Sequence, residues 1–194
     1  MATAALDSTA TIVGGVHHIF VAPFGSTMPT GIGASPGASL DTAFIALGYT
    51  ADTGSSFGVD TQSQDLYASQ SNDPIRTTIT SRKATITAPL IEWNEDSITT
   101  AFGGGAITSV TGGWKYTPPT GGTPTPVSVV MDILDGDVMT RIAMERGIVV
   151  GSVEGTFSKS AFATLPITIA AQAPVNQATS WYLIGTAAAL NPNS

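Results

Sequence analysis

Glycine and proline residues divide this chain into many short segments. Of its 194 residues, 21 are glycine and 12 are proline. They gather with Ser, Thr and Asn in three stretches, residues 27–36, 111–126 and 171–176, whose composition predicts loops. The segments between these loops are short, and most of them have the composition of β-strands.

Seven segments are candidate strands because apolar and β-branched residues dominate them. Asp135-Gly136 is a strong signal for a hairpin turn, and the alternation after it is typical of a sheet with one buried face. Pro89 predicts a break in its segment, and Pro166 a strand start or an edge. Hairpins in series predict a mainly β fold, an antiparallel β-sandwich or barrel-like domain. The candidate strands are residues 17–22, 76–90, 127–134, 138–145, 148–157, 165–169 and 181–185.

One short helix is predicted over residues 95–102 and a second, weaker one over residues 40–47. In the first helix, Asn94 is a favourable N-cap and two acidic residues follow it in the first turn. Trp93 is placed to pack on Ile98 as a hydrophobic staple, and a glycine follows where a left-handed residue ends helices. A helix this short needs a sheet to dock on. The predicted capping residues are Trp93, Asn94, Glu95, Asp96 and Gly103.

Charged residues are scarce and acidic on balance. They make up 11% of the chain, with a formal net charge of −7, and 42% of the residues are hydrophobic. So few charges favour a surface that is buried against other copies of the chain. The seven basic residues are scattered, which argues against a nucleic-acid grip. No run of 18 apolar residues occurs, so we expect no membrane partner.

The residues that carry most enzyme chemistry do not form a recognisable site. His17 and His18 are adjacent, so on a strand they point to opposite faces. The acidic stretch with Asp52, Asp60, Asp65 and Asp73 has spacings of 8, 5 and 8, which do not match a calcium loop. Cysteine is absent, which removes thiol chemistry and zinc–thiolate sites. The sequence therefore predicts no catalytic residue, no metal and no cofactor.

The order of parts along the chain resembles one known family. HIFVAPFGSTMP and ALGYTADTG are followed by an acidic stretch, a long strand that ends in Leu90-Ile91-Glu92, the capped helix and Phe102-Gly103-Gly104. This arrangement resembles the major tail (tail tube) proteins of long-tailed, siphovirus-like bacteriophages over about residues 17–173.

The resemblance implies a structural virion protein. Members of that family are similar in forming a small β-sandwich with one flanking helix, which closes as a ring of six. The rings stack into a hollow tube, and DNA passes through the lumen without specific binding. The implied partners are other copies of the chain, the tape measure protein, and the tail terminator and distal tail proteins. The implied location is the phage tail, assembled in the host cytoplasm.

The same resemblance suggests how the chain is divided. Residues 1–16 correspond to an N-terminal arm, residues 17–173 to the tube β-domain and residues 174–194 to a C-terminal strand or arm. A stacking loop is implied at about residues 50–73, and it holds Asp52, Asp60, Asp65 and Asp73. A long loop at about residues 111–126 has no assigned role.

Three alternatives remain open from the sequence. One is a tube protein of a contractile secretion system, which is similar in fold. Another is a monomeric β-sandwich binding module, such as a carbohydrate-binding or adhesin-like domain, with aromatic residues clustered on one sheet face. The third is an enzyme, which the missing catalytic residues disfavour.

Overall fold

The computed structural model describes residues 14–122 and 124–186. The predicted N-terminal arm lies almost wholly outside this part, as do the last eight residues of the predicted C-terminal arm. The described part is mainly β, with a single α-helix. The elements in chain order are β1 (Val16–Pro23), β2 (Ile45–Ala46), β3 (Ser56–Leu66), β4 (Arg76–Leu90), α1 (Glu95–Ala101), β5 (Ala106–Val110), β6 (Gly113–Thr117), β7 (Val127–Asp135), β8 (Val138–Val149), β9 (Thr156–Ser158), β10 (Ala161–Ala171) and β11 (Tyr182–Gly185).

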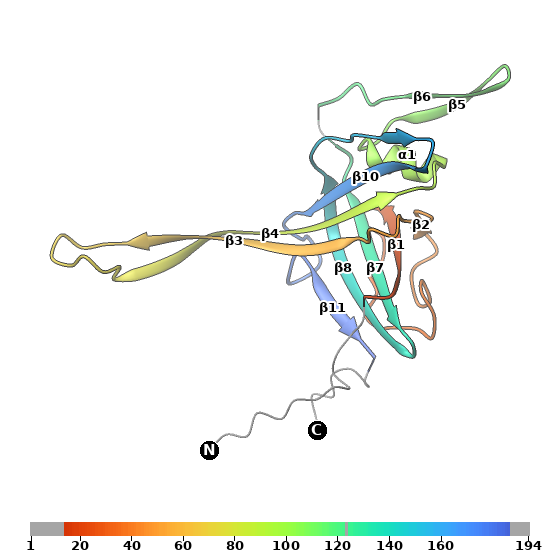
Figure 1. Ribbon diagram of the computed structural model, residues 1–194. Helices are drawn as coiled ribbons and strands as arrows, with labels where there is room; N and C mark the ends of the chain where they lie inside the picture. Colours follow the sequence, from red (N-terminus) through yellow and green to blue (C-terminus); the bar gives the residue numbers. More distant parts are fainter. Residues whose placement is uncertain (1–13, 123, 187–194) are drawn as a thin grey trace.

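The strands form one large antiparallel sheet and one separate hairpin. The order in the large sheet is β2-β1-β7-β8-β10-β4-β3, and β5 pairs only with β6. Strand β8 has two partners on one edge, because β11 pairs with its first half and β10 with its last three residues. The sheet therefore divides into two layers at β8, and among the described residues it does not close into a barrel (Figure 1).

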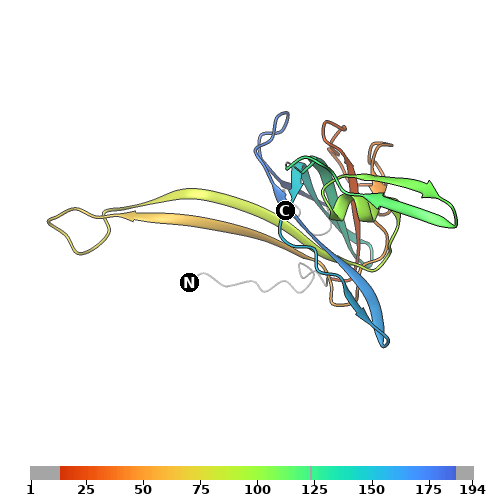
Figure 2. The ribbon, with the colours of Figure 1, turned by 90° about the horizontal axis from the view of Figure 1, so that it is seen from above.

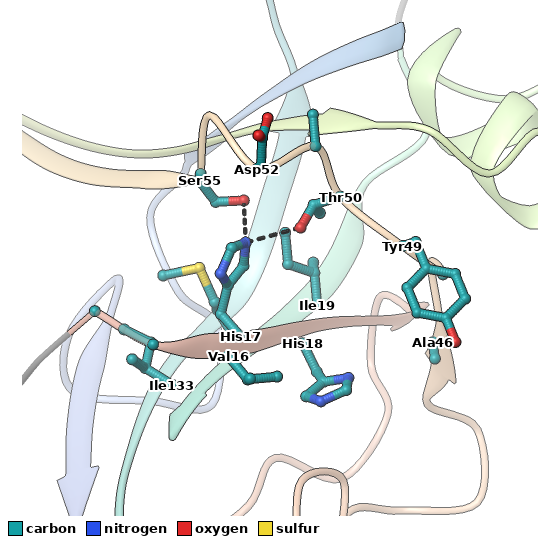
Figure 3. A pocket seen from close by; sticks show the side chains of 16 residues that line it. Val16, His17, His18, Ile19, Ala46, Tyr49, Thr50, Asp52, Ser55 and Ile133 are labelled. Atoms are coloured by element: carbon teal, nitrogen blue, oxygen red, sulfur yellow. Dashed lines mark hydrogen bonds between the residues drawn. The ribbon is translucent and has the colours of Figure 1, made fainter. Parts of the chain in front are cut away.

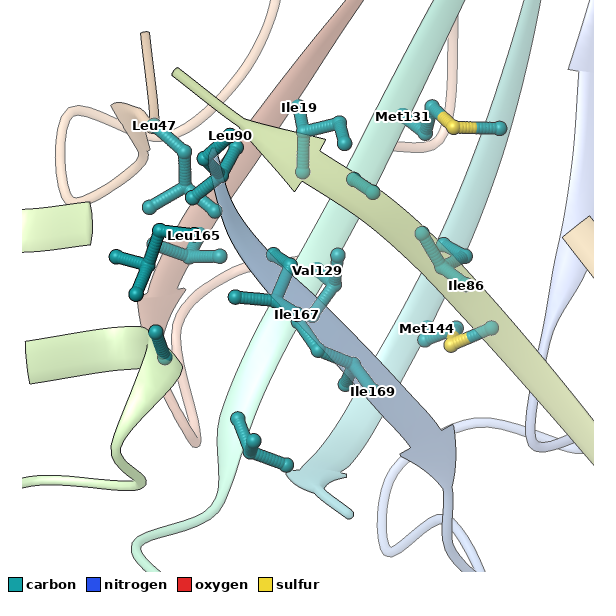
Figure 4. Packing of buried hydrophobic residues seen from close by; sticks show 14 of the residues in the cluster. Ile19, Leu47, Ile86, Leu90, Val129, Met131, Met144, Leu165, Ile167 and Ile169 are labelled. Atoms are coloured by element: carbon teal, nitrogen blue, oxygen red, sulfur yellow. The ribbon is translucent and has the colours of Figure 1, made fainter. Parts of the chain in front are cut away.

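The hydrophobic core lies between these two layers. Strands β1, β7 and β8 contribute Ile19, Val129 and Met144, while β4 and β10 contribute Ile86 and Ile167 from the other side (Figure 4). All of these side chains are almost completely buried. Fully burying an aliphatic side chain contributes about 1.5–3 kcal/mol, so this cluster dominates the stability of the body.

The outer face of β1, β7 and β8 is also covered, which differs from the expectation of one buried face. Residues 24–44 cross this face, and Met28 packs there with Val130 and Ala143. Arg141 lies on β8, between β7 and β11, and its side chain donates to the Gly31 and Ala38 carbonyl oxygens at 2.9 and 3.0 Å. Residues on both faces of β8 are therefore buried.

The capped helix confirms its local sequence signals. The Asn94 side chain accepts a hydrogen bond from the Ser97 amide at 2.8 Å, and the Ser97 hydroxyl accepts one from the Asn94 amide at 2.9 Å. The helix ends at Ala101, and Gly103 has a φ of +71°, as predicted for a left-handed residue. Ile98 and Ala101 face the core.

Two prolines proved compatible with continuous strands. Pro89 and Pro166 lie directly opposite each other in the β4–β10 pair. The Pro89 carbonyl accepts from the Ala51 amide at 2.8 Å, on the side away from β10. Because N–H and C=O of one residue point to the same side of an antiparallel strand, this rung needs no proline donor. The break predicted at Pro89 and the strand start predicted at Pro166 are therefore wrong. The alternative of an edge at Pro166 is compatible with the pairing, because β8 pairs only with residues 169–171 of β10.

Three further predictions were wrong about local structure. Residues 148–157 are not one strand, because β8 ends at Val149 and Gly151 takes a φ of +88° before β9 begins. Residues 40–47 form turns and the short strand β2 instead of a helix. The predicted long loop over residues 111–126 is partly the β5–β6 hairpin, which turns at Thr111-Gly112.

Candidate assembly surfaces

The most conspicuous feature is a hairpin that leaves the body of the molecule. Strand β3 and the first half of β4 pair along their whole length and project far beyond the sheet (Figures 1 and 2). We call residues 58–83 the arm. Nearly all of its side chains are exposed on both faces. A strand of eleven residues spans roughly 36 Å, so the arm reaches well away from the core.

The arm replaces most of the loop that was predicted over residues 50–73. That prediction rested on an acidic stretch without structure of its own, whereas residues 56–66 form β3. Pairing with β4 gives this stretch a regular structure. Pairing also brings basic residues of β4 beside the acidic residues of β3. Three acidic and three basic residues lie on the arm, so its formal net charge is zero. They are Asp60, Asp65, Asp73, Arg76, Arg82 and Lys83.

The four predicted aspartates are spread along this structure. Asp60 lies opposite Lys83 and accepts a hydrogen bond from the side-chain Nε2 of Gln62 at 2.9 Å. Asp65 accepts from the Thr77 hydroxyl at 2.6 Å. Asp73 lies at the arm tip, and Asp52 lies in the turn before β3. Within residues 14–122 and 124–186, no group of three potential metal ligands is close enough to hold an ion.

The root of the arm lies beside a cavity of about 570 Å³. His17 Nε2 is 3.0 Å from the Thr50 hydroxyl and 2.8 Å from the Ser55 hydroxyl, so one ring nitrogen contacts both ends of the turn that leads into β3 (Figure 3). His18 points to the other face of β1, as predicted. In the described part of the chain these hydroxyls are the hydrogen-bond partners of His17, so no carboxylate orients its ring as a catalytic triad requires.

One of the predicted helix-capping residues, Trp93, also contacts the neighbouring strands β9 and β10. The Trp93 indole donates to the Ala163 carbonyl at 3.1 Å, and its ring centroid is 5.8 Å from that of Phe157. The predicted packing of Trp93 on Ile98 stays a prediction. Glu95 and Asp96 occupy the first helical turn, where negative charge is favourable. Phe157 and Phe162 are about three-quarters exposed, so an aromatic patch flanks the helix start.

Sequence reasoning missed a buried carboxylate that fastens the C-terminal segment. The register of β7 and β8 shifts between Val127 and Val129, so β8 has a bulge near Glu145. The Glu145 carboxylate accepts hydrogen bonds from the Val175, Asn176 and Gln177 amides at 2.8–3.1 Å. Burial raises the pKa of Glu145, but the three backbone donors outweigh it and lower the pKa overall. Alternation alone could not reveal these partners, because they lie thirty residues away.

Membrane insertion through a helix finds no support in the described residues, whose one helix is too short to cross a bilayer. A neutral exposed arm, an exposed aromatic patch and a strand edge at β3 that has no partner among the described residues suit contact with another protein.

Comparison with known proteins gives one match over nearly the whole chain. The model of a family described as "Phage tail tube protein" matches residues 4–192. Among the solved structures that match is a chain from the "Virion of native gene transfer agent (GTA) particle". The two share 13% sequence identity with a TM-score of 0.40, over 76% of this chain and 92% of that chain. No protein with a curated function matches.

Proposed function

Because this family match covers almost its full length, the chain belongs to the phage tail tube protein family, and we propose that it assembles into stacked hexameric rings. It is a structural protein of a phage-type tail, located in the virion. The rings would form the hollow tube through which DNA is ejected. A non-enzymatic role is in keeping with the family, and the tube would be assembled in the host cytoplasm.

The exposed arm is the observation that carries this proposal. A two-stranded hairpin is marginally stable in water by itself, and this one extends with both faces in solvent. Exposed apolar residues lie along it, including Val59, Ile79 and Ile75, which are 40%, 51% and 67% exposed. In a monomer, this projecting arm buries little apolar surface and so contributes little to stability. A neighbouring copy that covers it would bury this surface, as permanent interfaces do.

Unpaired strand edges support the same conclusion. Strand β3 is the last strand of the sheet order, and within the described residues its outer edge has no partner strand. Exposed edges of this length favour pairing with another chain, and natural proteins cover them. Copies that join edge to edge would close a sheet that stays open in one chain.

Net charge suits a conduit for DNA. The arm is neutral, so the whole formal charge of −7 belongs to the rest of the chain. A lumen with excess negative charge repels phosphates, and DNA then slides through without adhering. We further expect contacts at the tube ends and in the lumen with tape measure, tail terminator and distal tail proteins.

Assembly and its dependence on the arm can be tested together. We expect the purified chain to form rings or hollow tubes in negative-stain electron microscopy, with sixfold averages. A matched variant replaces residues 61–82 with Asn-Gly, which joins the paired Asp60 and Lys83 through a two-residue hairpin turn. This variant is expected to fold and stay monomeric by light scattering. A wild-type chain that remains monomeric at high concentration would contradict the proposal.

A further inference from the structure

The two faces of the arm differ, and their register assigns each residue to one of them. Residues that pair across β3 and β4 point to the same face, and the faces alternate along each strand. Val59 pairs with Ala84, which is buried in the core. The face that includes Val59 therefore continues the core outward, and we call it the core-side face. Its exposed members are Val59, Thr61, Ser63, Asp65, Thr77, Ile79 and Arg82.

A bulge in β4 decides which distal residues join this face. Gln62 pairs with Ser81 and Ser63 with Ile79, so Thr80 is an extra residue between the two pairs. The Thr80 hydroxyl donates to the Gln62 carbonyl at 3.2 Å and so ties the bulge to β3. Without the extra residue, every position of β4 beyond it would change face. The bulge thus places Ile79 on the same face as Val59.

The opposite face has a different character. It carries Asp60 beside Lys83, two glutamines, and Leu66 beside Arg76. Long charged and amide side chains keep their polar ends in water at small cost. Four of the seven core-side residues are β-branched, and such residues pack well against a second surface. This difference favours burial of the core-side face against another surface, while the opposite face stays in solvent.

Charge and fold together identify the cover as a second copy of the chain. The arm has no net charge, whereas the rest of each copy carries −7, so arm and body can approach without the repulsion between two bodies. On the core-side face the charges of Asp65 and Arg82 cancel, so this face also approaches an acidic body without repulsion. A surface that meets a different surface of an identical chain generates rings or filaments, as a tube requires.

We propose that the core-side face of the arm, centred on Val59 and Ile79, docks on the body of a second copy, while the opposite face remains solvated. This inference rests on the proposed tube function. It adds which face forms the contact and assigns the Thr80 bulge the role of presenting Ile79 on that face.

Adjacent residues on opposite faces give a matched test. Ile79→Lys places a charge on the core-side face and Thr78→Lys places the same charge on the opposite face. Both positions are exposed, so both variants should fold, as circular dichroism and thermal unfolding would verify. We expect Ile79→Lys to raise the concentration needed for half assembly by about tenfold or more, which corresponds to about 1.4 kcal/mol. For Thr78→Lys we expect less than about twofold.

Cysteine labelling gives a second readout that does not require assembly to fail. The chain contains no cysteine, so Ile79→Cys and Thr78→Cys each introduce one defined thiol. In tubes assembled from the Ile79→Cys variant, maleimide should label the thiol at least about tenfold more slowly than in the monomer of that variant. In tubes of the Thr78→Cys variant, the labelling rate should be nearly the same as in its monomer. Equal protection at both positions, or protection of position 78 alone, would overturn the face assignment. A wild-type chain that never assembles would overturn the proposed function with it.

Discussion

Arg141 and Asp132 face each other across β7 and β8 and form an ion pair that is completely buried, with Nε 2.7 Å from Oδ1. A second bond joins Arg141 to Asp132 Oδ2 at 2.8 Å, and the same oxygen accepts from the Gly37 amide. The pair therefore holds residues 31–38 against the outer face of the sheet. Neither charge has access to water.

Removing one partner of this pair should be costly. Arg141→Met leaves the Asp132 carboxylate buried without its counter-ion, and Asp132→Leu leaves the guanidinium in the same position. We expect each to lower the free energy of unfolding by about 3–5 kcal/mol in urea denaturation. The double variant should lose clearly less than the sum, because no uncompensated charge remains. Additive losses would show that the two residues act separately.

Glu145 should make stability depend on acid pH. Its folded-state pKa is lowered from 4.5, so its contribution is present above that pH and is lost as the pH falls through the folded-state pKa. Glu145→Gln should be less stable than wild type at pH 7, and the gap should narrow below pH 4.5. Glu154→Gln, at an exposed position, is the control and should leave the pH profile unchanged. A constant gap at all pH values would contradict this role.

The N-cap of α1 should have a measurable effect. Asn94→Ala removes the acceptor for the Ser97 amide and should cost about 1 kcal/mol of stability. Asn94→Asp keeps an acceptor oxygen and should retain most of the wild-type stability. Equal losses in thermal unfolding would show that the acceptor oxygen is not the stabilising group, and would point to the side-chain NH2 of Asn94, which donates to Glu92 at 3.3 Å.

His17 should restrain the root of the arm. His17→Ala removes the ring that contacts Thr50 and Ser55, and a hydrogen bond contributes about 0.5–1.5 kcal/mol. We expect hydrogen exchange at the Ala51 and Gly54 amides to rise about threefold to tenfold. His18→Ala alters the other face of the same strand and should leave these amides unchanged. Equal hydrogen exchange at these two amides in the His17→Ala and His18→Ala variants would show that His17 does not restrain the root of the arm.

Local signals in the sequence were sufficient for the elements that depend on neighbours in the chain. The helix cap at Asn94, the turn at Gly136 and the start of β4 at Arg76 all follow from residues within a few positions. The antiparallel β class followed from the same reasoning. Capping and turn geometry are decided locally, so one sequence is enough to predict them.

Pairing between distant segments could not be predicted in this way. The acidic stretch was interpreted without its partner strand, so the balance between Asp60 and Lys83 was missed. Pro89 and Pro166 were interpreted singly, although together they make a rung without amide donors. Arg141 and Glu145 were placed on the correct strand, but their partners lie in loops far along the chain. Each of these features depends on the register between segments.

Strand β4 passes without interruption from the arm into the body, where its last residues form a ladder with β10. A pull on the arm tip along this strand would act on all rungs of that ladder at once and would not peel them apart singly. The arm is thus anchored in shear, the direction in which a sheet resists force best. Any contact that holds the arm tip would therefore be secured by the whole β4–β10 ladder.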